Sequence, residues 1–140
     1  EKIKIELLDL IKKNDLEKNI DVLGYLENKD AFSLLKSGKI FVFPSHEEGW
    51  GIAIAEAMAC KLPVISWNLP VYKEVFEDNS VQVKENDIES FADKVIELLD
   101  NKRLRDSISE KAYDFVKRYS WEKVANIEKN IIHCLQNGNK

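Results

Sequence analysis

Proline, glycine and cysteine are all scarce in this chain, which has 3, 5 and 2 of them among 140 residues. So little proline and glycine excludes a collagen-like or low-complexity chain, and a hydrophobic fraction of 44% excludes wholesale disorder. The two cysteines, Cys60 and Cys134, have neither the spacing of metal ligands nor that of a redox pair. They are expected to be reduced thiols of a cytoplasmic protein.

Long apolar runs and clusters of basic residues are also missing. No run approaches the roughly 18 apolar residues of a membrane span. The 21 Lys and Arg against 25 Asp and Glu give a net charge of −4, which argues against nucleic acid as the main partner. The chain begins with Glu1 and carries no signal-peptide pattern, so it is expected to be an excerpt from a longer protein.

What is present is an alternation of two apolar patterns. Helices are predicted after Asp87 and over 3–14, 29–37, 52–60, 71–76, 102–118 and 121–135. Strands are predicted over 20–23, 40–43, 63–67 and 81–83. The residues suited to cap helices are Asn28, Asp87, Asn101 and Ser120, with Gly138 just beyond the last helix.

This alternation predicts an α/β fold, a Rossmann-like parallel sheet with helices on both faces. The continuous apolar run 40–43 is expected to be a strand buried on both faces. No repeat or linker divides the chain, so 1–140 is expected to be a single domain.

The loop 44–51 is the expected place for a ligand. In an open parallel sheet, ligands bind beyond the carboxyl ends of the strands, where this loop should lie. Gly49 and Gly51 let the backbone approach a ligand closely, and the helix that starts near Gly51 aims free N–H groups at the same spot. Anions, phosphates above all, bind well at such a helix start.

Two carboxylates, Glu48 and Glu56, stand eight residues apart across this helix start. From the rise of a helix we expect them to lie on the order of 10 Å apart. The acid and base of a glycoside hydrolase stand about 5–10 Å apart around one bond, so a hydrolase that uses this pair is disfavoured. The pair is better suited to hold the two ends of an elongated ligand with the shape of a nucleotide sugar.

The segment 44–59, PSHEEGWGIAIAEAMA, resembles the P-S-x-x-E-G-F/W-G-x-x-x-x-E-A-M-A signature of retaining glycosyltransferases. More narrowly it is similar to family four, also called glycosyltransferase group 1, with its E-x7-E motif and GT-B architecture. The stretches 22–25, 61–65 and 120–122 are similar to other parts of that family. The resemblance implies a truncated C-terminal half of a GT-B fold, a nucleotide-sugar-binding domain lacking its first β-α segment and the N-terminal acceptor domain.

The resemblance also implies roles for single residues. Glu48, the candidate catalytic residue, would contact hydroxyls of the transferred hexose, and Glu56 would hold the ribose. The amides of four residues would line the hexose and the diphosphate: Gly49, Trp50, Gly51 and Ile52. Residues near Tyr25 and Leu26 would contact the base.

The implied partners are a nucleotide-sugar donor and a sugar or lipid-linked acceptor, the latter bound by the missing domain. No cofactor or metal ion is implied, because protein cations and the helix N-terminus stabilise the departing diphosphate. The full-length protein would be cytoplasmic, either free or peripheral at the membrane.

The chain departs from the family in two places. The Arg and Lys that clamp the diphosphate would lie upstream of Glu1, and the G-G-x-x-E stretch usual after Trp67 is replaced by NLPVYKE at 68–74, which lacks the glycines although Glu74 keeps its register. Residues 1–140 by themselves are therefore expected to bind a donor weakly and to show no turnover.

Other interpretations stay open at this point. A non-catalytic Rossmann-like module that binds an anion or a partner protein is the main alternative. His46 fits a polar contact better than a general base. Trp50 either packs in the core or forms a wall of the site, and Trp67 and Trp121 are expected to be packing anchors.

Overall fold

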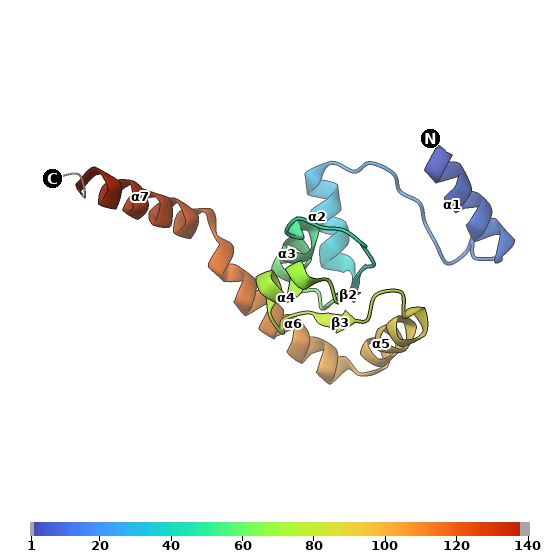
Figure 1. Ribbon diagram of the computed structural model, residues 1–140. Helices are drawn as coiled ribbons and strands as arrows, with labels where there is room; N and C mark the ends of the chain where they lie inside the picture. The colour runs from blue at the N-terminus through green and yellow to red at the C-terminus, as the bar shows by residue number, and fades with distance from the viewer. Residues whose placement is uncertain (1, 138–140) are drawn as a thin grey trace. The chain divides into compact units, whose positions relative to one another are not determined.

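The computed structural model describes residues 2–137, and the chain divides between Ala31 and Phe32 into two compact units (Figure 1). The first unit contains α1 (Lys2–Lys13), which confirms the helix predicted over 3–14. After α1 the residues 20–27 have no regular structure, so the strand predicted over 20–23 is wrong. A strand is stable only when a neighbour pairs with its backbone, and no described strand pairs with this segment. That 1–140 is a single domain stays a prediction.

The second unit contains a parallel sheet in the order β1 (Phe41–Phe43), β2 (Val64–Trp67), β3 (Val81–Val83). The pairing sets Val42 opposite Ile65 and Ile65 opposite Val81. The central strand β2 is buried along its whole length. The edge strand β1 is not, because Val42 is 47% exposed, so the prediction that 40–43 is buried on both faces is wrong.

The predicted helices are confirmed, with small shifts at their ends. Their bounds are α2 (Asn28–Ser37), α3 (Ile52–Ala59), α4 (Pro70–Phe76), α5 (Ile88–Asp100), α6 (Lys102–Val116) and α7 (Trp121–Asn137), with a 3₁₀ turn at Lys117–Tyr119. None of the helices within residues 2–137 is long and apolar enough to cross a membrane. Together with the parallel sheet, these helices confirm the predicted Rossmann-like α/β class.

Helix capping follows the sequence at three of the four predicted sites. Asp87 accepts a hydrogen bond from the Ser90 amide at 3.1 Å, and Asn101 accepts one from the Leu104 amide at 3.0 Å. The Ser120 hydroxyl accepts from the Lys123 amide at 3.4 Å. Asn28 is not a cap, because α2 begins at Asn28 itself. Gly138 lies outside the described residues.

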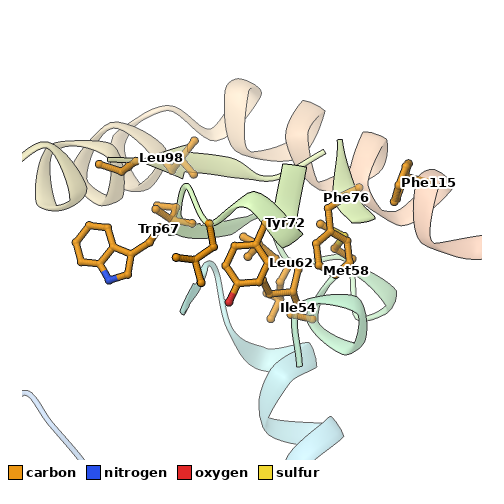
Figure 2. Close-up of a cluster of buried hydrophobic side chains, with 14 residues drawn as sticks. Ile54, Met58, Leu62, Trp67, Tyr72, Phe76, Leu98 and Phe115 are labelled. Atoms are coloured by element: carbon orange, nitrogen blue, oxygen red, sulfur yellow. The ribbon is translucent and has the colours of Figure 1, made fainter. Parts of the chain in front are cut away.

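The core gathers around β2 (Figure 2). Trp67 packs against Phe91 of α5 with ring centroids 4.6 Å apart, which confirms it as a packing anchor. The largest fully buried side chains include Tyr72 and Phe76 of α4, together with Ile54 and Met58 of α3. Trp121 is 88% exposed, so its prediction as an anchor is wrong.

The contact between α3 and α4 depends on Gly51, the residue before α3. Gly51 has a φ of 95°, which favours glycine strongly. A Cβ at this position would stand 3.0 Å from Cε2 of Phe76 and 3.1 Å from Cε1 of Tyr72. Both rings are fully buried and have no room to move away. Only glycine lets α3 begin this close to α4.

We predict that Gly51→Ala destabilises the fold by about 2–4 kcal/mol, the sum of backbone strain and overpacking. Urea unfolding followed by circular dichroism measures the change. Gly49→Ala is the matched control, since a Cβ there meets nothing within 4 Å, and it should unfold like the original chain. An equal loss of unfolding free energy in both variants would contradict the packing argument.

Candidate functional site

The loop 44–51 lies at the carboxyl edge of the sheet, where the sequence placed it. The strands are parallel, so β1, β2 and β3 all end at this edge. Three connections therefore meet here, the loop 44–51 after β1, residues 68–69 after β2 and residues 84–87 after β3. This edge is where an open α/β sheet binds its ligand.

Hydrogen bonds join the three connections. The Trp67 indole N–H donates to the Pro44 carbonyl at 3.1 Å. His46 Nδ1 lies 2.6 Å from Glu85 Oε1, and the Glu85 amide donates to Asn68 Oδ1 at 3.0 Å. We call these five residues the strand-end network. It fixes the start of the loop 44–51 and gives His46 a polar contact with Glu85.

Asn68, the first residue after β2, has a structural role of its own. Its amide N–H donates to the Val83 carbonyl at 2.8 Å, while its side-chain oxygen accepts from Glu85. Asn68 thus ties the end of β2 to the end of β3. Leu69 and Pro70 then open α4, with Pro70 at its first turn.

Glu48 is half-buried, and its charge acts on the ionisation of Tyr72 in α4. Burial raises the pKa of Tyr72 to about 12, the Glu48 carboxylate adds to this rise, and the Ser45 hydroxyl opposes it. The Ser45 hydroxyl itself donates to the Glu47 carbonyl at 3.1 Å. The Glu48 carboxylate is therefore one of the groups that favour the protonated form of Tyr72.

The Trp50 side chain packs in the core rather than forming a wall of the site. Its ring meets Phe76 edge-on at 5.4 Å and Tyr119 at 5.0 Å between centroids. Gly49, next to it, is exposed. The loop is thus anchored by an aromatic side chain while its backbone stays near the surface.

The N-terminus of α3 carries free backbone donors. At the start of the helix, the Ile54 and Ala55 amides donate to the Gly51 carbonyl at 3.0 and 3.3 Å. The amides of Ile52 and Ala53 therefore precede the helical ladder and carry the positive end of the helix dipole. This arrangement suits an anion.

Glu56 lies one turn into α3, on the same exposed face as Ile52, which is 67% exposed. Helical side chains lean toward the helix N-terminus, so Glu56 leans toward the end where Gly51 and Glu48 lie. In the structure, Glu48 precedes the start of α3 and Glu56 lies one turn after it. Their predicted contacts with a hexose and a ribose stay predictions.

Tyr25 and Leu26 belong to the first compact unit. Tyr25 is 91% exposed and Leu26 is half-buried, in a segment without regular structure. Their contact with a nucleotide base stays a prediction. Within residues 2–137, no group of three or more His, Cys, Asp or Glu could hold a metal ion.

Sequence reasoning did not single out Asn68, Tyr72 and Glu85. A signal for two of them was available, because Asn68 and Glu85 each follow the end of a predicted strand closely. Polar residues at such positions meet at one sheet edge when the strands are parallel. Nothing in the sequence pointed to Tyr72, since an aromatic residue on a short helix is predicted to pack in the core.

Comparison with known proteins decides the family. The model of "Glycosyl transferases group 1" matches residues 4–115. The chain belongs to this family. It is also 30% identical over 116 residues to the O-antigen chain mannosyltransferase B of Escherichia coli, covering 83% of this chain and 30% of that protein. The chain spans about a third or less of the curated relatives it matches.

Two solved structures of glycosyltransferases agree with the fold. The C-terminal domain of a group 1 family protein, LpcC of Francisella tularensis, has a TM-score of 0.74 at 30% identity, with 84% of this chain and 62% of that chain covered. A Staphylococcus aureus TarM mutant in complex with fondaparinux, alpha-GlcNAc-glycerol and UDP has a TM-score of 0.81 at 27% identity. The match covers 91% of this chain and 26% of that chain. The GT-B relationship that the sequence implied is therefore confirmed.

We predict that Asn68→Ala speeds hydrogen exchange of the Glu85 amide by about fivefold, because that amide loses an acceptor worth about 1 kcal/mol. Exchange followed by NMR on the 140-residue chain gives the rate. Asn101→Ala is the matched control, as it removes the same kind of bond from Leu104 and should leave Glu85 unchanged. Unaltered exchange at Glu85 in Asn68→Ala would refute the network.

Proposed function

We propose that this chain is the donor-binding part of a retaining GT-B glycosyltransferase. The whole protein would transfer a hexosyl unit from a nucleotide-diphospho-sugar to a sugar or lipid-linked acceptor. One observation carries the proposal. In a chain of the group 1 family, the free N-terminus of α3 lies at the carboxyl edge of the sheet, with Glu48 before it and Glu56 one turn into it.

The diphosphate binds at the start of α3. The amides of Gly49, Trp50, Gly51 and Ile52 face the hexose and the diphosphate as donors, and the helix dipole favours the negative charge. As the bond to the sugar breaks, charge grows on the departing diphosphate. The same donors stabilise that charge without reorganising, and no metal ion is required.

Glu48 and Glu56 orient the donor at its two ends. The Glu48 carboxylate accepts hydrogen bonds from hexose hydroxyls, and Glu56 accepts them from the ribose. Each such bond to a charged group contributes about 1.5–3 kcal/mol. Tyr25 and Leu26 contact the base, and no side chain of this chain acts as a nucleophile.

Two comparisons support this proposal. A TarM structure similar to this chain is in complex with UDP, and a relative in Escherichia coli is named as a mannosyltransferase. Membership in the group 1 family disfavours the alternative of a non-catalytic binding module. The protein would act in the cytoplasm, free or peripheral at the membrane.

Titration of the 140-residue chain with UDP, GDP and ADP tests donor binding directly. We predict amide shifts confined to residues 49–52 and their neighbours, with one base favoured, weak affinity and no sugar transfer. Weak binding follows because the net charge of the chain is −4, which disfavours a dianionic diphosphate. Turnover by this chain, or an absence of shifts in the loop with all three nucleotides, would contradict the prediction.

In the full-length protein, we predict that Glu48→Gln lowers kcat/KM by about 10- to 100-fold, the loss of one charged hydrogen bond. Glu56→Gln should instead raise the KM of the donor, because the ribose does not react. Steady-state kinetics with varied donor measure both. Glu47→Gln is the matched control, since this exposed neighbour should leave kinetics unchanged. A similar loss in Glu47→Gln would show a general effect of loop charge instead.

A further inference from the structure

The loop before α3 has one large side chain, Trp50, between two glycines. Gly49 is exposed, and a Cβ at this position would meet nothing within 4 Å. Gly51 has a φ of 95°, in the region that glycine adopts freely. Of these three residues, Trp50 is the one with a side chain that can pack. Its ring therefore holds the peptide groups on either side of it.

Two aromatic rings from different elements hold the Trp50 ring. Phe76 of α4 is fully buried and meets it edge-on, with centroids 5.4 Å apart. Tyr119 of the 3₁₀ turn is half-buried and meets it edge-on at 5.0 Å. Edge-to-face pairs at such separations are favourable beyond the apolar area that they bury. The Tyr119 ring thus supplies one side of the packing that fixes Trp50.

Tyr119 is itself held in place on α4. Its hydroxyl donates to the Val75 carbonyl at 2.8 Å. The preceding residue, Arg118, donates to Glu77 Oε1 at 2.8 Å, just past the end of α4. These two bonds fasten the 3₁₀ turn to the end of α4. The Tyr119 ring therefore meets Trp50 from a fixed support, although the two residues are far apart in the chain.

We propose that Tyr119 is a positioning residue for the nucleotide diphosphate of the donor. Acting through the Trp50 ring, Tyr119 keeps the amides of residues 49–52 in the arrangement that binds the diphosphate. Without the Tyr119 ring, binding has to order the loop first, and this cost lowers affinity. The inference rests on the proposed function, because that proposal assigns the loop amides to the diphosphate.

The test is Tyr119→Leu in the full-length protein, titrated with UDP, GDP and ADP in a calorimeter. We expect the Kd of the nucleotide that binds tightest to rise about tenfold, with an unchanged number of sites. These two readings separate positioning from stability. A loss of folded protein lowers the number of sites and leaves the Kd of the folded molecules as it was.

Two variants are matched controls. Tyr119→Phe keeps the ring and loses the bond to Val75, so Tm should fall while Kd stays within about twofold of the original. Tyr113→Leu removes another half-buried tyrosine ring of this region, which lies 4.7 and 4.3 Å from the ammonium groups of Lys61 and Lys117. It should leave Kd unchanged. A tenfold rise of Kd in either control would overturn the inference.

Trp50→Leu tests the same contact from the other side, and it decides the matter if Tyr119→Leu does not fold. Kd should rise by about tenfold or more, and adding Tyr119→Leu should change it by less than about twofold. Independent losses, or a normal Kd in either single variant, would overturn the inference. The proposed function would survive that result, since the original protein still binds its nucleotide. An original protein that binds none of the three nucleotides would refute the proposed function and the inference with it.

Discussion

The contact of Gly51 with two aromatic rings of α4 determines where α3 can begin. A left-handed backbone at Gly51 turns the chain from the loop into the helix, and the missing side chain leaves room for Tyr72 and Phe76. Because α4 follows directly on β2, this contact sets the helix start at the edge of the sheet. The positions of the free amides and of Glu48 both follow from it.

The loop before Gly51 is held from two sides by different forces. On one side, the Trp50 ring is packed edge-on between Phe76 and Tyr119. On the other, polar bonds tie Pro44 to Trp67 and His46 to Glu85. Side chains therefore anchor the loop at both ends, and the backbone amides between them remain available to bind a ligand. Such a division suits a site that must recognise a phosphate mainly by amide donors.

The sequence predicted well what depends on neighbours along the chain. The caps at Asp87 and Asn101 and the apolar helix after Gly51 rest on local signals, and the structure has them. The prediction failed where the structure of a segment depends on a residue far away in the chain. Residues 20–23 are an example, because no described strand pairs with them. The exposure of Trp121 is a similar case, since burial depends on what packs against a residue.

At the site, the sequence located the loop 44–51, because parallel strands send their carboxyl ends to one edge. It could not find the contact of Gly51 with Tyr72, which are 21 positions apart. Nor could it choose between core and wall for Trp50, because that choice depends on Tyr119, far along the chain. Contacts between residues that are far apart in the chain leave no pattern in the local sequence.

The outer edge of β1 has a consequence for solubility. No described strand covers it, and open sheet edges can recruit strands from other molecules. Two features limit this recruitment of strands. The strand has only three residues, and the Pro44 that follows has no N–H to extend a ladder. Aggregation through this edge would therefore have to proceed by a very short pairing.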